Sequence, residues 1–305
     1  MVRILATDGM AKKAVKELGE LGFEVVQEFY DADTLAEKVK EFDVLVVRSA
    51  TKVRCPVIDA AAETGRLKLI IRGGVGIDNI DAPYARSKGI MVVNTPGASS
   101  ASVAELVIAH ILSVARHLAF ANVTMREGSW EKKACKGIEI AGKTLGLIGM
   151  GRIGKETAAR AAAMGMHVIY TNRSGHKPEN EPFLWVPMEE LLGRSDFISL
   201  HLPAAKGSEP MINRNMIEKM KDGVYLINTS RGILVNEEDL LDALDSGKIA
   251  AAGLDVYMEE PTRNERLYKH PRISLTPHVG ASTREAQERI GEETVVHILN
   301  QFPVS

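Results

Sequence analysis

The sequence predicts an α/β fold built from two doubly wound parallel sheets. Three observations carry this prediction. Short apolar runs alternate with helical patterns, a glycine-rich turn stands between an apolar run and a helix at residues 149–154, and 305 residues suffice for about two domains. Because parallel sheets are buried on both faces, their strands read as continuous apolar runs, and we interpret the runs as strands.

The first unit starts at the N-terminus. We expect its strands at residues 2–6, 24–27, 44–47, 69–71 and 91–93, and helical patterns such as MAKKAVKELGEL (10–21) alternate with the earlier ones. This part of the chain has no glycine fingerprint for a dinucleotide. We therefore predict a smaller, flavodoxin-like sheet that serves the substrate.

A long apolar helix comes next. The segment 100–121 is predicted to form one helix that is capped at Ser99 or Ser100. Its apolar side is nearly unbroken, which is more than the surface helix of a monomer needs. The pattern predicts a homodimer that forms through the helix around 100–121.

The glycine-rich turn predicts a Rossmann dinucleotide-binding domain. The motif Gly149-x-Gly151-x-x-Gly154 follows an apolar run at 144–148 and precedes the helix former ETAARAAAMG. The first glycine permits the tight bend, the second lets the backbone approach a pyrophosphate, and the third lets helix and strand pack closely. The N–H groups near Arg152 and Ile153 would then face the phosphates. The alternative is a glycine-rich connection that binds nothing.

The residues after the next strand (166–170) favour NADP. An acidic side chain about 20 positions past the glycines holds the ribose 2′-OH of NAD. Here Asn172 stands 18 positions after Gly154 and is followed by Arg173 and Ser174. These side chains offer donors and a positive charge to a 2′-phosphate, which a carboxylate would repel. NAD is the alternative, because the same residues also suit an ordinary turn.

Three polar residues follow three further predicted strands. Arg231 comes after the strand 223–228, Glu260 lies just past the strand 251–257, and His278 follows 274–276. Ligands of open α/β sheets bind at the carboxyl ends of strands. Arginine can grip a carboxylate, histidine can take up or return a proton, and a carboxylate can orient the imidazole. The set predicts hydride transfer at a carbon that bears oxygen beside a carboxylate.

Charge and composition exclude several other functions. A net charge of −2 gives no electrostatic case for nucleic acid. We see neither a signal peptide nor an apolar run of about 18 residues, so we expect a cytoplasmic protein that is not bound to a membrane. Cys55 and Cys135 lie far apart without companions at metal spacing, and no metal is expected. His110 and His117 are interpreted as packing or interface residues.

Several motifs together resemble the D-2-hydroxyacid dehydrogenase family. They are GMGRIG (149–154), NTSRG (228–232), GLDVYMEEP (253–261) and LTPHVGAS (275–282). Four further motifs, VRSATKV (47–53), RGGVGIDNID (72–81), NTPGASS (94–100) and SVAEL (102–106), are closest to D-3-phosphoglycerate dehydrogenases. The resemblance runs from about Val2 to Gln301. The chain looks like a short form without the C-terminal module that senses serine in many of these enzymes.

The resemblance implies roles for individual residues. It implies Arg231, Glu260 and His278 as the catalytic residues, and Asp255 as a contact to the nicotinamide carboxamide. The expected cofactor-binding residues are Gly149, Gly151, Arg152, Ile153, Gly154, Asn172, Arg173, Ser174, His201, Leu202, Pro203, Ser208, Thr229, Asp255, His278 and Gly280. The expected substrate-binding residues are Arg48, Ser49, Arg72, Gly73, Gly74, Val75, Arg231 and His278.

The expected domains follow from these motifs. The substrate domain comprises residues 1–98 and 282–305, because the final helix, about 282–300, should return to it, and the dinucleotide-binding domain comprises 99–281. A cleft between them would close over the substrate and exclude water.

The predicted reaction is hydride transfer between a nicotinamide cofactor and a 2-hydroxy or 2-keto acid, with 3-phosphoglycerate and 3-phosphohydroxypyruvate as the preferred pair. An NADPH-dependent hydroxypyruvate or glyoxylate reductase is the alternative within the family. An NAD(H)-sensing, corepressor-like scaffold is the alternative from another class, and turnover of a 2-keto acid would separate the two classes.

Overall fold

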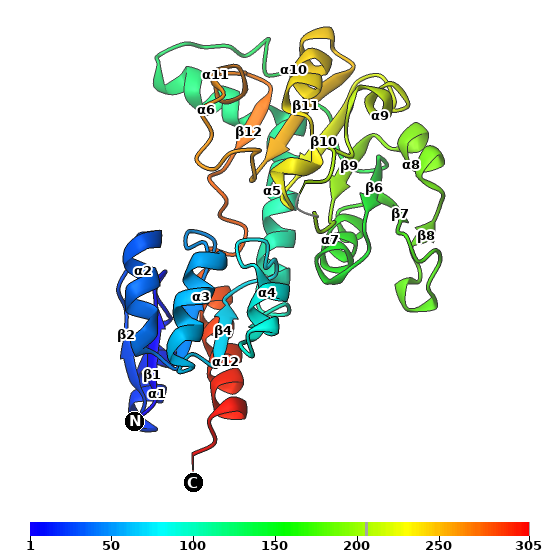
Figure 1. Cartoon of the computed structure of the whole chain (residues 1–305). Coiled ribbons are helices and arrows are strands. Elements are labelled where there is room, and N and C mark those ends of the chain that lie inside the picture. The colour runs from blue at the N-terminus through cyan, green and yellow to red at the C-terminus, as the bar shows by residue number, and fades with distance from the viewer. Residues whose placement is uncertain (205–206, 305) are drawn as a thin grey trace. The chain divides into compact units, whose positions relative to one another are not determined.

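The computed structural model describes residues 1–204 and 207–304 and divides into two compact units (Figure 1). Unit 1 comprises Met1–Ser99 and Ala281–Ser305, and unit 2 comprises Ser100–Gly280. Each unit is an α/β sandwich around its own parallel sheet.

Unit 1 contains a five-stranded parallel sheet in the order β2-β1-β3-β4-β5. This is the flavodoxin-like strand order that the sequence predicts. Its strands are β1 (Arg3–Ala6), β2 (Glu24–Val26), β3 (Val44–Val47), β4 (Leu69–Arg72) and β5 (Met91–Asn94). Its helices are α1 (Lys12–Glu20), α2 (Ala32–Lys38), η1 (Val39–Glu41), α3 (Cys55–Thr64), α4 (Ala82–Ser87) and α12 (Arg284–Gln301).

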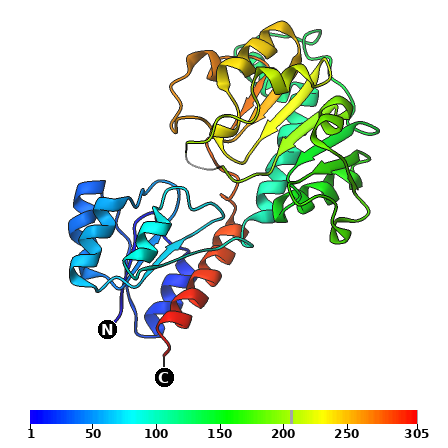
Figure 2. The ribbon, with the colours of Figure 1, turned by 45° about the vertical axis from the view of Figure 1, so that its right-hand side comes forward.

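Alternating side chains of these strands build two core layers. Leu5, Leu45 and Ile70 pack against α2, α3 and α4, whereas Ile4, Val44 and Leu69 pack against α1 and α12. Figure 2 shows α12 beside α1, although the two helices lie at opposite ends of the chain. Gly291 permits this close approach, since a Cβ there would lie 3.0 Å from the Cβ atoms of Ala11 and Ala14.

Unit 2 contains a seven-stranded parallel sheet in the order β12-β11-β10-β9-β6-β7-β8. The chain reverses its direction of growth between β6 and β9, as in a Rossmann fold, and ligands of such sheets bind at this switch point. Its strands are β6 (Thr144–Ile148), β7 (His167–Thr171), β8 (Leu184–Trp185), β9 (Phe197–Leu200), β10 (Val224–Asn228), β11 (Ile249–Leu254) and β12 (Ile273–Leu275).

Helices cover both faces of this sheet. Helices α5 (Ser100–Arg116) and α7 (Arg152–Ala163) pack on one face, and α8 (Met188–Arg194), α9 (Arg214–Glu218) and α10 (Glu237–Ser246) pack on the other. The remaining helical segments are α6 (Leu118–Arg126), η2 (Pro178–Asn180), η3 (Gly232–Leu234) and α11 (Glu265–Tyr268). All strand ends that the sequence analysis singled out lie in this one sheet.

The helix predicted for 100–121 is wrong as a single element. Helix α5 ends at Arg116, His117 adopts a left-handed backbone with φ of 53°, and α6 continues at an angle of 67°. The break has a non-local cause, because the N–H of Ile138 donates to the carbonyl of Ala115 in the last turn of α5. The buried side chains of α5 pack within unit 2, against α7, β10 and β11.

No single helix in residues 1–204 and 207–304 is long and apolar enough to cross a membrane. The bent pair α5 and α6 together has the length and composition of a span, as the buried core helix of a folded unit also can.

Candidate active site

Three neighbouring strands of unit 2 deliver the predicted catalytic residues. Arg231 follows β10, Glu260 follows β11 after a short loop, and His278 follows β12. Because β10, β11 and β12 are adjacent and parallel, their carboxyl ends lie at one edge of the sheet. The fold therefore brings the three side chains to the same edge.

Glu260 and His278 form a direct pair. Glu260 Oε2 lies 2.7 Å from His278 Nδ1, and Glu260 Oε1 accepts a hydrogen bond from the N–H of Tyr257 at 3.2 Å. Burial raises the pKa of the Glu260 carboxyl, but the hydrogen bond and charge of His278, the Tyr257 N–H and the charge of Arg231 together lower it below its usual value. The carboxylate thus holds the imidazole by Nδ1 and leaves Nε2 for another group.

His278 has a strained backbone. Its φ of 53° lies in the left-handed region, which costs an L-residue roughly 1–2 kcal/mol. Such strain persists only where the surroundings determine the conformation. Here the two following N–H groups, those of Val279 and Gly280, donate to Asp255 at 2.8 and 2.9 Å. These contacts fix the backbone of His278 and with it the direction in which its imidazole extends.

Arg231 is held by its own strand end. Its carbonyl accepts from Asn228 Nδ2 at 2.9 Å, and its Nη1 donates to the carbonyl of Ser230 at 2.6 Å. Asn228 is fully buried, whereas the Arg231 side chain is partly exposed. A rigid strand end thus presents a permanently charged, forked donor beside the Glu260–His278 pair.

The glycine turn has the space that a pyrophosphate needs. Gly149 has φ of 107°, and a Cβ there would collide with the carbonyl oxygen of His201. A Cβ on Gly151 would meet nothing within 4 Å, and one on Gly154 would collide with the carbonyl of Gly149. Gly151 caps α7, whose first residues are Arg152 and Ile153. The turn leaves an open cradle over the start of a helix, where anions bind.

Unpartnered polar atoms at neighbouring strand ends fit a dinucleotide. Asn172 Oδ1 after β7, His201 Nδ1 after β9 and Thr229 Oγ1 after β10 are shielded from solvent and have no hydrogen-bond partner. Buried polar groups are nearly always satisfied, so these atoms suit a ligand with polar groups along the same edge. Burial lowers the pKa of His201 to about 4, which keeps the ring neutral.

The expected ribose-binding residues also lie at this edge. Asn172, Arg173 and Ser174 directly follow β7, and the N–H of Gly149 donates to the carbonyl of Thr171 at 2.9 Å. Arg173 and Ser174 are exposed and Asn172 is partly buried. These three positions therefore carry one positive charge and no carboxylate beside the glycine turn.

The other residues expected to contact the cofactor differ in their exposure and in the hydrogen bonds that they already make. Leu202 and Pro203 continue the loop after His201, and Ser208 is exposed beyond it. The N–H of Gly280 already donates to Asp255 Oδ2. Asp255 is 1% exposed and also accepts from Thr276 Oγ1 at 2.6 Å. Burial raises the pKa of the Asp255 carboxyl, and the donated hydrogen bonds oppose this rise.

The expected substrate-binding residues of unit 1 cluster at the ends of β3 and β4. Arg48 follows β3, Arg72 ends β4, and the N–H of Gly73 donates to the carbonyl of Val47 at 2.9 Å. Gly74 has φ of 145°, and a Cβ there would collide with the Arg72 guanidinium. Ser49 and Val75 are exposed beside this turn. Arg48 and Arg72 thus both lie beside the Gly73–Gly74 turn.

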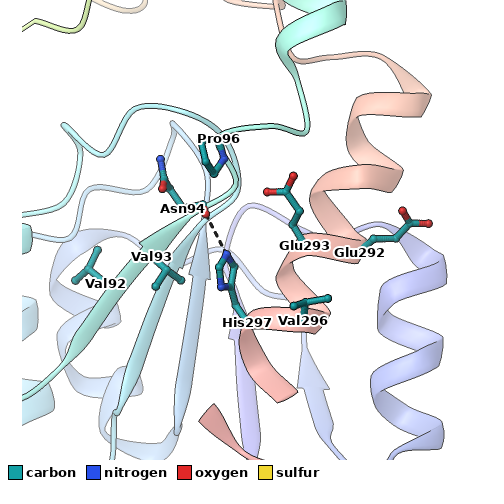
Figure 3. Close-up of a pocket in the computed structure, with 8 residues that line it drawn as sticks. All are labelled: Val92, Val93, Asn94, Pro96, Glu292, Glu293, Val296 and His297. Atoms are coloured by element: carbon teal, nitrogen blue, oxygen red, sulfur yellow. Dashed lines mark hydrogen bonds between the residues drawn. The ribbon is translucent and has the colours of Figure 1, made fainter. Parts of the chain in front are cut away.

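A separate groove in unit 1 contains none of the predicted residues. It has a volume of about 600 Å³ and lies between β5 and α12 (Figure 3). Val92, Val93 and Val296 form its apolar wall, and Glu292 and Glu293 border it. His297 Nε2 lies 3.1 Å from the carbonyl of Asn94. Its two carboxylates make it unsuitable for an anionic substrate.

Across residues 1–204 and 207–304, no group of three or more His, Cys, Asp and Glu side chains could hold a metal ion.

Comparison with known proteins decides the family. Residues 108–280 match the family model described as the NAD-binding domain of D-isomer specific 2-hydroxyacid dehydrogenases. The chain belongs to the D-2-hydroxyacid dehydrogenase family. It is an NAD(P)-dependent oxidoreductase that transfers a hydride between a nicotinamide cofactor and a 2-hydroxy or 2-keto acid.

The individual relatives are different enzymes of the family, so they leave the substrate of this chain open. The chain is 47% identical to a hydroxypyruvate reductase of Thermotoga maritima over 99% of both proteins. It is 45% identical to a D-3-phosphoglycerate dehydrogenase of Methanocaldococcus jannaschii over 95% of this chain, but it spans only 56% of that relative. A glyoxylate reductase structure from Paecilomyes thermophila superposes with a TM-score of 0.87 at 33% identity, covering 98% of this dehydrogenase and 94% of that chain.

The sequence analysis missed several polar residues that support the site. The hydroxyl of Tyr257 donates to the carbonyl of Thr276 at 2.8 Å and lies 3.3 Å from that of Leu254. His110, predicted to be a packing or interface residue, is buried on α5, and its ring also lies 3.0 Å from Thr276 Oγ1. These contacts join positions up to 166 residues apart, so no local sequence signal marks them.

Proposed function

We propose that this dehydrogenase is a reductase that uses NADPH to reduce hydroxypyruvate. The cofactor in this proposal rests on the strand end after β7, where Asn172, Arg173 and Ser174 stand in place of a carboxylate. A carboxylate at this position accepts a hydrogen bond from the ribose 2′-OH of NAD and repels a 2′-phosphate. The positive charge and hydroxyl here favour the phosphate. The substrate rests on the 47% identity to a hydroxypyruvate reductase over 99% of both proteins.

The residues of unit 2 divide the chemistry among them. Arg231 binds the carboxylate of the keto acid through two parallel hydrogen bonds and orients its carbonyl carbon. His278, held through Nδ1 by Glu260, donates a proton from Nε2 to the 2-oxygen. A bound nicotinamide supplies the two-electron reduction. Asp255 Oδ2 accepts a hydrogen bond from the N–H of Gly280 and has a second lone pair for the carboxamide.

Initial rates with both cofactors test this proposal. We expect kcat/KM for hydroxypyruvate to be at least about tenfold higher with NADPH than with NADH, because the 2′-phosphate gains charge-assisted hydrogen bonds. Asn172→Asp should reverse this preference, and Glu179→Asp, an exposed change nearby, should leave it unchanged. Equal or tighter use of NADH by the unmodified enzyme would refute the NADPH assignment.

A second candidate substrate is 3-phosphohydroxypyruvate, the predicted oxidised partner of 3-phosphoglycerate. The observation that favours it is the pair of arginines, Arg48 and Arg72, beside the Gly73–Gly74 turn. Burial lowers the pKa of Arg48 and Asp8 opposes this, but a guanidinium stays charged at neutral pH.

A panel of 3-phosphoglycerate, hydroxypyruvate, glyoxylate and 2-oxoglutarate separates the candidates. If the phosphorylated acid is the substrate, Arg48→Gln should raise the KM for that acid by about tenfold or more. The KM for glyoxylate should stay nearly unchanged. A higher kcat/KM for the phosphorylated pair in the unmodified enzyme would place this candidate first.

We also propose that the enzyme is a homodimer, with α6 rather than the core of α5 at the contact. Leu118, Val123 and Met125 on α6, and Trp130 after it, are each at least half exposed. Such a concentration of exposed apolar side chains is typical of an interface. Sedimentation at micromolar concentration should give a dimer that Val123→Asp weakens, and a wild-type monomer would contradict this. The cytoplasmic location expected from the sequence stays a prediction.

A further inference from the structure

A chain of buried hydrogen bonds joins helix α5 to the turn that carries His278. His110 on α5 is 2% exposed, and its Nδ1 and Nε2 lie 3.1 Å from Ser274 Oγ and 3.0 Å from Thr276 Oγ1. Thr276 Oγ1 lies 2.6 Å from Asp255 Oδ1. The side chains connect α5, β12 and the loop after β11.

The hydrogen bonds in this chain have only one consistent direction. The Asp255 carboxylate can only accept, and it already accepts from the N–H groups of Val279 and Gly280. Thr276 therefore donates its single hydroxyl proton to Asp255. Its oxygen must then accept from the Nε2–H of His110, which leaves Nδ1 to accept from the hydroxyl of Ser274.

The His110 ring is uncharged at neutral pH. Burial lowers the pKa of His110 to about 4. Asp255 is the charged member of this series of hydrogen bonds, and Thr276 separates it from the ring. A neutral ring with one N–H and one acceptor nitrogen matches its two hydroxyl partners. The arrangement has no unpaired ring atom.

We infer that His110 and Thr276 are positioning residues, which orient the Asp255 carboxylate and through it the strained backbone of His278. This inference rests on the proposed roles of Asp255, Glu260 and His278. Asp255 holds the two N–H groups that follow His278, so a carboxylate free to rotate would no longer fix the left-handed conformation. Thr276 removes that freedom, and His110 orients the Thr276 hydroxyl.

Paired substitutions test the inference. Thr276→Val and His110→Leu remove the hydrogen bonds, whereas Thr276→Ser keeps the hydroxyl and His110→Gln keeps a donor near the position of Nε2. We expect the first pair to lower kcat by about tenfold or more with little change in the KM of the keto acid, because Arg231 binds the acid independently. The second pair should restore most of the loss.

Hydrogen exchange gives a readout that needs neither cofactor nor activity. The amides of Val279 and Gly280 should exchange faster in Thr276→Val than in the wild type and in Thr276→Ser, while amides of β6 stay unchanged. The inference is overturned if kcat and exchange are unaltered, or if kcat falls only in proportion to global stability without rescue by the conservative variants. A wild-type rate in His278→Gln would instead refute the proposed function.

Discussion

The first strand–turn–helix segments of the two units have the same topology but opposite contents. In unit 1 the chain passes from β1 to α1 through residues 7–11, which include Asp8 and Gly9. In unit 2 it passes from β6 to α7 through Gly149, Met150 and Gly151. Both turns lie at the carboxyl edge of a doubly wound sheet, where such folds bind ligands. Only the second has the features of a dinucleotide site.

The turn of unit 1 carries a carboxylate, Asp8, that binds the loop after β3. Asp8 Oδ2 accepts from the N–H groups of Arg48 and Thr51 at 2.6 and 3.2 Å, and Thr51 Oγ1 lies 2.7 Å from Asp8 Oδ1. In unit 2 the turn has no acidic side chain and leaves open space at Gly151. The fold supplies the location, and a few residues decide whether an external anion can use it.

The largest expected effect concerns Arg231, the candidate substrate-binding arginine of unit 2. Arg231→Ala should lower kcat/KM by about 3 kcal/mol or more in transition-state free energy, because a charge-assisted bidentate contact is lost. Arg266→Ala is the matched control, since that guanidinium forms surface ion pairs with Glu238 and Asp245. Steady-state kinetics with hydroxypyruvate measure both variants, and a near-wild-type Arg231→Ala would show that the acid is bound elsewhere.

Acid should destabilise unit 2 through His110. The folded-state pKa is about 4 instead of 6.5, so between these values the unfolded chain takes up a proton that the folded chain does not. The stabilisation is present above pH 6.5 and is lost as the pH falls toward 4, by about 3 kcal/mol in all.

Unfolding free energies of wild type and His110→Leu between pH 7 and 4.5 measure this effect. The variant should show a flatter pH dependence, whereas His176→Leu, at an exposed position, should retain the wild-type slope. Parallel curves for wild type and His110→Leu would mean that the ring is accessible to protons.

An alanine in place of one glycine in each turn distinguishes the two turns further. Gly149→Ala should reduce stability by about 2 kcal/mol or more and abolish NADPH binding, because its Cβ collides with the carbonyl of His201. Gly9→Ala should cost only about 1 kcal/mol, from its φ of 75°, since its Cβ would lie 3.9 Å from the nearest side chain. Thermal unfolding and fluorescence titration measure both, and equal losses would contradict the distinction.

A last variant tests whether the Asp8 carboxylate alone distinguishes the two turns. Asp8→Ala leaves the N–H groups of Arg48 and Thr51 without their acceptor and should cost about 1–2 kcal/mol of stability. It should not create a second NADPH site, because unit 1 lacks the three glycines. Calorimetric titration that found a second equivalent of NADPH in this variant would contradict that reasoning.

The strands and the glycine turn could be predicted because their signals are local. β1, β3, β4, β6 and β10 are short apolar runs, and the fold class that follows from them is confirmed. Strands β8 and β9 were not identified. β8 has only two residues, and the four residues of β9, although wholly apolar apart from Ser199, follow directly after the polar end of α8.

Contacts between distant segments explain the remaining errors. The predicted helix 100–121 breaks at His117 where Ile138 meets Ala115, and a helical pattern cannot anticipate a segment that crosses its end. The three candidate catalytic residues could be named from motifs, but the link from His110 through Thr276 to Asp255 exists only in the folded unit. Its members belong to three elements.

A crystal structure of the enzyme with NADPH and oxamate, an unreactive analogue of a 2-keto acid, would decide whether Arg231 and His278 act as proposed. We expect the Arg231 guanidinium to bind the oxamate carboxylate and His278 Nε2 to lie within hydrogen-bond distance of the adjacent carbonyl oxygen, with Nδ1 still on Glu260. An analogue bound away from Arg231, or an imidazole turned from its carbonyl oxygen, would refute the proposed roles.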